Sequence, residues 1–304
     1  MNLDKIFHLK ENNTNVKTEI LAGVTTFMTM AYILAVNPNI LAEAGMDHGA
    51  VFTATALAAF IGTLCMAIFA NYPFALAPGM GLNAYFAYTV VLQMGYSWKV
   101  ALAAVLVEGI IFILLSLLSV REAIFDAIPY NLKKAVSVGI GLFIAFIGLQ
   151  NAKVVIGGST LLSLFSLDGY LAAAAGGKDF VAASMNDVGI TVLLAIIGII
   201  ITGIMVVKNV KGNILWGILI TWVLGIICQF AGLYVPNPEL GFYSLLPDFS
   251  AGISIPSLSP IFAKFSLEGV PILEFVVIVF AFLFVDLFDT LGTLIGVSSK
   301  ANML

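Results

Sequence analysis

Charged residues are scarce in this sequence. Only 10% of its 304 residues are charged, whereas 61% are hydrophobic, and the mean hydropathy is +1.09. An ordinary soluble domain is about half apolar and about a quarter charged. The composition therefore excludes a typical soluble domain and predicts a polytopic membrane protein.

Basic residues, cysteines and histidines are also few. The 13 lysines and arginines and the net charge of −4 provide no basic surface for phosphate backbones, so we exclude nucleic acid as a partner. Cys65 and Cys228 lie in separate apolar runs, and His8 and His48 flank the first run. These residues lack the spacing of metal ligands, so we expect no metal site.

The first 19 residues are polar and carry charges of both signs. They lack the apolar segment and the small-residue cleavage site of a secretory signal. We therefore expect residues 1–19 to form a cytoplasmic N-terminus and the first apolar run to act as the insertion signal.

Eight apolar runs are candidate membrane spans, because a spanning helix requires about 20 apolar residues. Seven are uninterrupted: 20–36, 50–70, 100–119, 135–149, 189–207, 214–230 and 272–297. The eighth, 74–92, contains Pro78, Gly79 and Gly81 close together, so we expect a broken helix there. The long loops 151–188 and 231–271 are expected to be irregular. With eight crossings most lysines and arginines lie on one side, and the positive-inside rule predicts that both ends are cytoplasmic.

The interrupted run predicts a binding site. Non-helical backbone at membrane depth is tolerated only where protein buries it or where it lines a cavity. The half-helix after the break would direct its partly positive N-terminus into the bundle, as in secondary transporters. Gly81 and Asn83 lie in its first turn, and Tyr85 and Phe86 are candidate stacking partners. The alternative is that Asn83 only caps the half-helix and that the aromatic rings belong to the core.

Two carboxylates lie in the last apolar run. An ionised carboxylate at the middle of a membrane costs about 2.5–3.5 kcal/mol or more, so such residues normally face a cavity. Asp286, Asp289 and Thr293 share one face of a helix and form a polar stripe. Burial and mutual repulsion favour a proton on one of the two acids, which predicts proton coupling. The alternative is a structural pair that is hydrogen-bonded to neighbouring helices.

Three further residues in the apolar runs are of interest. Glu108 is a third intramembrane acid, and we weigh a role in proton coupling at the site equally with a structural hydrogen bond. Gly292 and Gly296 form a pattern of small residues four apart, which predicts the close approach of another helix.

Three stretches together resemble the AzgA-like purine permeases (hypoxanthine, guanine and adenine permeases) of the nucleobase-ascorbate transporter (NCS2) superfamily. They are EILAGVTTFMTMAYILAVNP (19–38), APGMGLNAYFAY (77–88) and FVDLFDTLGTLIG (284–296). The resemblance implies the all-α uracil-permease fold of fourteen spans in two inverted seven-span repeats, in which a core domain moves against a gate domain. On that map residues 20–119 and 272–304 belong to the core, residues 133–232 to the gate, and residues 233–271 to an extracellular loop.

The resemblance also implies a function and a site. Asn83 and Asp286 match the substrate residues of the family, and Asp289 matches the second acid of its motif. The implied activity is purine uptake across the plasma (inner) membrane by an elevator-like proton symporter, with a homodimer as its assembly. Family members run well past this length, so we expect a C-terminally truncated permease with about eight spans, without the second broken span.

Other functions remain open. The substrate of a transporter would alternatively be another nucleobase or a related anionic or heterocyclic solute. A membrane enzyme would use the acids of DLFD to bind Mg²⁺, although the spans contain neither a second acidic motif nor basic residues for a diphosphate. A channel or a structural protein would leave the broken helix beside an acid pair unexplained. We therefore predict a transporter rather than an enzyme, with no cofactor and with the proton as coupling ion.

Overall fold

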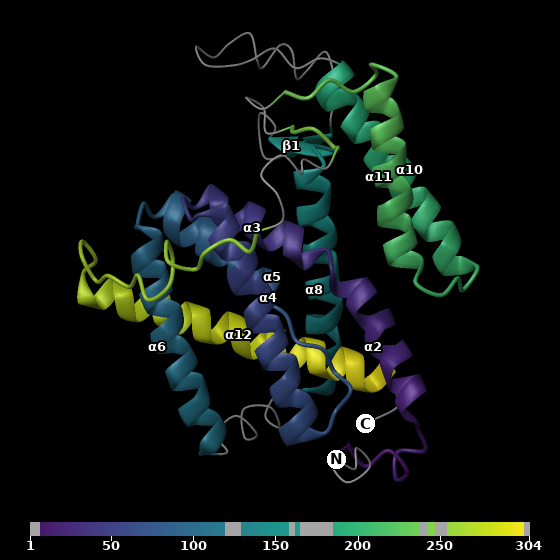
Figure 1. Ribbon diagram of the computed structural model, residues 1–304. Helices are drawn as coiled ribbons and strands as arrows, with labels where there is room; N and C mark the ends of the chain where they lie inside the picture. Colours follow the sequence, from purple (N-terminus) through teal and green to yellow (C-terminus); the bar gives the residue numbers. More distant parts are fainter. Residues whose placement is uncertain are drawn as a thin grey trace. The chain divides into compact units, whose positions relative to one another are not determined.

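The computed structural model describes residues 7–118, 129–157, 162–164, 185–237, 242–246 and 254–300, and helices dominate it (Figure 1). The chain divides into two compact units. Unit 1 comprises Met1–Ile144 and Ile255–Leu304, and unit 2 comprises Ala145–Ser254. Helix α8 (Tyr130–Asn151) contributes to both, because the boundary falls within it.

Five helical segments in the described part of the chain are long and apolar enough to cross a membrane. They are Val16–Glu43, His48–Ala70, Trp98–Leu117, Ile190–Val207 and Asn213–Phe230. Each contains or nearly coincides with one of the predicted runs. The predicted class, an all-α polytopic membrane protein, is therefore confirmed.

The first span is bent rather than straight. It consists of α2 (Val16–Met30) and α3 (Ile33–Glu43), and α2 begins where the Asn15 side chain accepts a hydrogen bond from the Thr18 N–H at 3.0 Å. Pro38 lies inside α3 and removes one backbone donor. Helix α4 (His48–Cys65) is capped by Asp47 and packs against α3. It continues as the π-helix η1 (Met66–Ala70).

The next span is broken, as predicted. Residues 71–79 form no helix, and Asn71 adopts a left-handed conformation with φ 52°. Helix α5 (Met80–Ala84) then begins after Gly79 and continues as the π-helix η2 (Tyr85–Gln93). Gly79 is the N-cap and no side chain caps this helix, so Asn83 is not its cap.

Two long helices complete unit 1. Helix α6 (Trp98–Leu117) packs against η2, and helix α12 (Ile272–Lys300) crosses α6 and packs against α5 (Figure 1). Ile278 and Phe282 of α12 are fully buried in this contact region. The run with the two aspartates is therefore one continuous helix that lies against the broken span.

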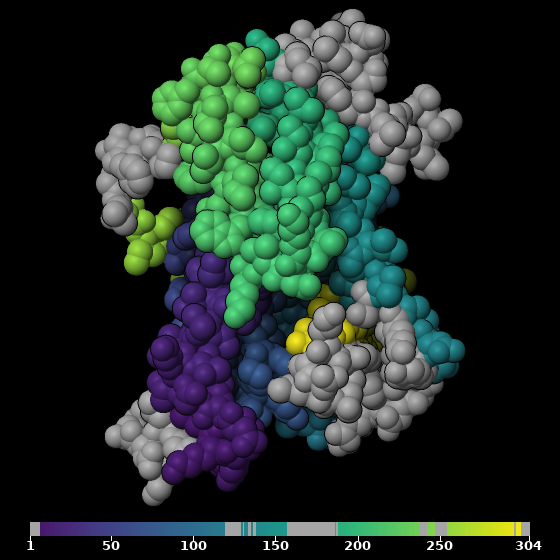
Figure 2. Space-filling model, turned by 90° about the vertical axis from the view of Figure 1, so that its right-hand side faces the viewer, coloured from purple at the N-terminus to yellow at the C-terminus, as the bar shows by residue number. Residues whose placement is uncertain are grey.

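Unit 2 contains a helix pair and a short hairpin. Helices α10 (Ile190–Val207) and α11 (Asn213–Phe230) lie side by side (Figure 2). The π-helix η3 (Met185–Gly189) precedes α10. Strands β1 (Val155–Gly157) and β2 (Leu162–Leu164) pair in antiparallel register within the loop predicted to be irregular, which corrects that prediction. The rest of residues 158–184 lies outside the described residues.

Candidate functional site

Asn83 belongs to a buried polar chain that links α5, α3 and α4. Its Nδ2 donates to Oδ1 of Asn37 at 2.6 Å, and Nδ2 of Asn37 donates to Oγ1 of Thr55 at 2.6 Å. The Thr55 hydroxyl in turn donates to the Val51 carbonyl at 2.7 Å. Asn37 is 3% exposed and Thr55 is 2% exposed. Buried polar groups require such partners, so this chain holds the Asn83 side chain in place.

Sequence reasoning missed Asn37 and Thr55. The available signal was an asparagine, Asn37, directly after the apolar run 20–36 and directly before Pro38. That pattern is also typical of a helix end, and a partner 18 or 46 residues away cannot be read from one sequence.

Asp289 lies directly against the break in the third span. A Cβ atom added to Gly79 would overlap the Oδ2 atom of Asp289. Gly79 has φ −73° and ψ 127°, which any residue adopts. Glycine therefore matters here for space rather than for backbone conformation: a larger residue would turn the Asp289 carboxyl group away from the start of α5.

The three predicted acids share one electrostatic neighbourhood. Asp286 is half-buried, and its Oδ1 accepts a hydrogen bond from the Thr290 hydroxyl at 3.2 Å. Asp286 acts electrostatically on both Asp289 and Glu108. Glu108 of α6 is 4% exposed, and its Oε1 has no hydrogen-bond partner among the described residues. Two helices, α6 and α12, thus bring one buried and two half-buried carboxyl groups into one neighbourhood.

The aromatic candidates pack against α12. The Tyr85 ring lies edge-on to the Phe282 ring, with 4.8 Å between centroids and an interplanar angle of 82°. The Phe86 ring is 6.5 Å from the same Phe282 ring and is buried. Both rings therefore fix the half-helix against the helix that carries the aspartates.

A pocket of about 380 Å³ in unit 1 contains one of the acids. Its lining consists of Gly81, Gly139, Ile140, Phe143, Phe284, Val285, Phe288 and Asp289. Asp289 is the only polar side chain in this lining, and three phenylalanine rings surround it. The volume is within the range of small-molecule sites, about 300–1,000 Å³. The structure thus brings Gly81 and Asp289 to one cavity, whereas Asn83, Tyr85, Phe86, Asp286 and Glu108 are not in its lining.

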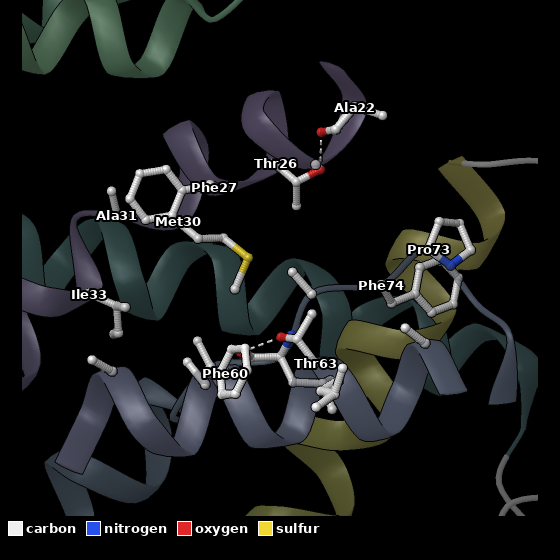
Figure 3. Close-up of a pocket in the computed structure, with 18 of the residues that line it drawn as sticks. Ala22, Thr26, Phe27, Met30, Ala31, Ile33, Phe60, Thr63, Pro73 and Phe74 are labelled. Carbon is white, nitrogen blue, oxygen red and sulfur yellow. Dashed lines mark hydrogen bonds between the residues drawn. The ribbon is translucent and has the colours of Figure 1, made fainter. Parts of the chain in front are cut away.

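The non-helical part of the broken span lines a second pocket, of about 580 Å³ (Figure 3). Figure 3 shows Phe27 and Met30 of α2 on one side, Phe60 and Thr63 of α4 on another, and Phe74 beside them. The Thr63 hydroxyl accepts from the Leu76 N–H at 2.9 Å and donates to the Leu76 carbonyl at 3.3 Å. The extended backbone therefore lines a cavity, and at Leu76 both of its polar groups have a hydrogen-bond partner, as expected at membrane depth.

Of the two predicted packing glycines on α12, Gly292 is buried and Gly296 is half-buried. Thr293, predicted to share a face with Asp286 and Asp289, lies on the same continuous helix and donates its hydroxyl hydrogen to backbone carbonyls, among them that of Asp289. Thr290 adds a second hydroxyl, which bonds to Asp286.

The chain is similar to known permeases over most of its length. The chain matches the model described as "Permease family" over residues 17–303. It is 41% identical over 302 residues to the guanine/hypoxanthine permease PbuO of Bacillus subtilis, covering 98% of this chain and 63% of the relative. It is 40% identical over 310 residues to the guanine/hypoxanthine permease PbuG of Bacillus subtilis, covering 98% and 63%.

A third relative is the adenine permease AdeP of Escherichia coli, which is 37% identical over 310 residues, covering 99% of this chain and 60% of the relative. The chain spans about three fifths of the length of these curated relatives. The chain belongs to the Permease family, which confirms its resemblance to the purine permeases of the nucleobase-ascorbate transporter superfamily.

Proposed function

We propose that this protein takes up a purine base, namely hypoxanthine, guanine or adenine, across the plasma membrane together with a proton. The names of the relatives support the purine class. The observation that carries the proposal is the Asp289 carboxyl group, which lies against Gly79 at the interruption of the membrane helix and also lines, with Gly81, a neighbouring pocket of about 380 Å³. Asp286 and Asn83 lie outside this lining, on the same helix as Asp289 and in the same half-helix as Gly81.

In this proposal two polar side chains bind different edges of the base. Asp286 accepts hydrogen bonds from ring N–H groups, and Asn83 contacts another edge of the base. An aromatic ring stacks on the purine, an interaction worth about 1–3 kcal/mol in other base-binding proteins. Tyr85 is the more exposed of the two candidate rings, because Phe86 is buried.

The acids also provide the coupling to protons. Charges of the same sign repel strongly where water is excluded, and a proton bound by one carboxyl group removes part of that repulsion. Asp286, Asp289 and Glu108 form such a group. Binding of base and proton together would then let the proton gradient drive uptake.

The proposed transport cycle is elevator-like. The core residues 20–119 and 272–304 carry the site and move against the gate residues 133–232, with both ends of the described chain on the cytoplasmic side. A homodimer is the proposed assembly.

Transport assays test this function directly. The complete gene that encodes this chain is expressed in a bacterium deficient in purine uptake, and uptake of radiolabelled hypoxanthine is measured with and without a protonophore. We expect uptake that collapses with the protonophore and in Asp286→Asn and Asn83→Ala. Gly203→Ala is the matched control, because a Cβ atom there meets nothing within 4 Å.

The outcomes separate the parts of the proposal. Uptake that survives the protonophore would contradict proton coupling and leave the purine assignment intact. No purine uptake by membrane-inserted protein would contradict the purine assignment. A Mg²⁺-dependent reaction in the same preparation would favour the enzyme alternative instead.

A further inference from the structure

The hydrogen bonds around Asn37 all run in one direction, from Asn83 to Val51. The Thr55 hydroxyl has one hydrogen, and that hydrogen is directed at the Val51 carbonyl, which only accepts. The Thr55 oxygen therefore accepts from Asn37, so the NH₂ group of Asn37 faces Thr55 and its carbonyl oxygen faces Asn83. Asn83 must then donate through Nδ2. One hydroxyl and two amide groups thus form a single chain of donors and acceptors, so the Asn83 amide depends on Asn37 and Thr55 for its position.

Reversal of this chain involves all three side chains. The Asn37 and Asn83 amides would have to rotate together, and the Thr55 hydroxyl would have to leave the Val51 carbonyl to donate to Asn37. Asn37 and Thr55 are shielded from water, so no solvent would replace the lost bonds. The Oδ1 atom of Asn83 takes no part in the chain, and in this orientation it is the acceptor that Asn83 offers to a ligand.

We propose that Asn37 and Thr55 are positioning residues that orient the Asn83 amide, so that the site selects bases presenting a ring N–H to its Oδ1. This inference rests on the proposed function and adds a specificity rule to it. Neither residue is required to touch the substrate. The chemical class selected is a heterocycle with N–H donors on more than one edge, because ionised carboxyl groups such as Asp286 are also acceptors.

Thr55→Val is the sharpest test, because valine has the shape of threonine without the hydroxyl. It removes the hydrogen bond that orients Asn37 and leaves Asn83 itself unchanged. Thr55→Ser keeps the hydroxyl and should retain the wild-type behaviour. Thr53→Val is the matched control: Thr53 lies on the same helix, is 8% exposed and donates to the Pro256 carbonyl at 2.8 Å, outside the chain.

The readout is a ratio measured on the full-length protein in cells. Unlabelled hypoxanthine and its 1-methyl, 7-methyl and 9-methyl derivatives compete with labelled hypoxanthine. The ratio is the half-inhibiting concentration of a derivative divided by that of hypoxanthine. The wild type should reject at least one derivative, because the methyl group removes the N–H that Asn83 reads. In Thr55→Val we expect that ratio to fall by about tenfold, the selectivity of about one hydrogen bond. Thr53→Val and Thr55→Ser should keep it.

A smaller amount of protein in the membrane does not change this ratio. The size of the methyl group is the same for every variant, so a difference in the ratio between variants is not caused by its bulk. Should Thr55→Val not reach the membrane, Asn37→Ala is judged by the same ratio, because it removes both hydrogen bonds. Unchanged ratios in a protein that transports purines would overturn this inference alone. Absence of purine uptake by the wild type would overturn the proposed function and this inference with it.

Discussion

Gly79 illustrates how a missing side chain positions a charge. Its backbone conformation suits any residue, but a Cβ atom would overlap the carboxyl oxygen of Asp289. We expect Gly79→Ala to turn the Asp289 carboxyl group away and to reduce uptake. The stability should fall by no more than about 1 kcal/mol, because the colliding atom is the end of a side chain that can rotate. Thermal unfolding of the purified protein and uptake by cells measure the two effects.

Gly81→Ala provides a comparison for the stability effect. A Cβ atom at Gly81 would lie 3.6 Å from Cγ1 of Val285, an ordinary contact distance. Its unfolding temperature should therefore stay close to that of the wild type. Equal losses of stability in the two variants would contradict the role of space at Gly79.

Tyr96 allows a prediction about pH outside the membrane. Its hydroxyl donates to a carboxylate oxygen of Glu274, and this hydrogen bond, followed by desolvation and by the negative charge, raises the pKa of Tyr96 above 10.0. The stabilising contribution is therefore fully present below pH 10.0 and is lost as the pH rises through the raised pKa. The difference between the ultraviolet titrations of the wild type and Tyr96→Phe should show a tyrosine that ionises above pH 10.0.

Two further variants test the cause of the raised pKa of Tyr96. In Glu274→Ala the pKa of Tyr96 should fall, because the main cause of the shift is gone. Glu268→Ala removes the same charge from another exposed position and should leave the titration unchanged. A pKa of Tyr96 that does not respond to Glu274→Ala would refute this account.

The residues of the candidate site could be predicted only in part. Asn83 and the acids were visible because polar groups are conspicuous in apolar runs. The partners of these residues were not visible: Gly79 was interpreted only as a helix breaker, and nothing local in the sequence joins it to Asp289. Asn37 and Thr55 were missed for the same reason, since their hydrogen bonds depend on how three helices pack.

At the scale of elements, α10 and α11 form a reciprocal contact. A Cβ atom on Gly198 would overlap Thr221 of the other helix, and a Cβ atom on Gly217 would overlap Thr202. Each threonine hydroxyl donates at 2.8 Å to a carbonyl of its own helix, namely that of Gly198 or Gly217. Small residues that let two backbones approach closely are typical of helix pairs in membranes.

We expect Gly198→Ala to destabilise the protein by about 1–3 kcal/mol, because the methyl group forces the two helices apart. Thr221→Ala in the same chain should restore most of the loss, since it removes the atoms that collide. The unfolding temperature of the purified protein is the measurement.

Gly203→Ala in the same helix is the control, because a Cβ atom there meets nothing within 4 Å. It should leave the stability unchanged or raise it by about 0.5–1 kcal/mol, since alanine favours a helix interior. A loss as large as that of Gly198→Ala would mean that the glycine contact is not the cause.

Hydrophobic patterning located the elements but not their details. All eight predicted runs correspond to helices or, at residues 71–93, to an extended segment and a half-helix. The bend between α2 and α3 and the π-helix η2 were not predicted. Apolar composition requires that backbone groups bond to each other in the membrane, but it does not determine in which helical register they do so.

For the whole molecule, the distribution of basic residues predicts the orientation in the membrane. With Cys65 and Cys228 replaced, single cysteines at Asn12 and Lys264 should behave oppositely in intact cells. A membrane-impermeant maleimide should label Lys264→Cys and should reach Asn12→Cys only after the cells are opened. Labelling of Asn12→Cys in intact cells would contradict a cytoplasmic N-terminus.

The polytopic helical class followed from composition, but the two compact units did not. Which helices belong together depends on contacts such as Gly79 with Asp289 or Gly198 with Thr221, and these join positions far apart in the chain or on different helices. A single sequence records the small residues without recording their partners.

Unit 1 is discontinuous in sequence, and this has a consequence for biosynthesis. The ribosome adds Asp289 about 210 residues after Gly79, which at about 5–20 residues per second corresponds to about 10–40 s. During that interval the broken span has entered the membrane without the helix that packs against it, while unit 2 is being made. During this interval the unwound segment of the broken span lacks its packing partner. We therefore expect the insertion machinery to shield it from lipid until α12 has been made.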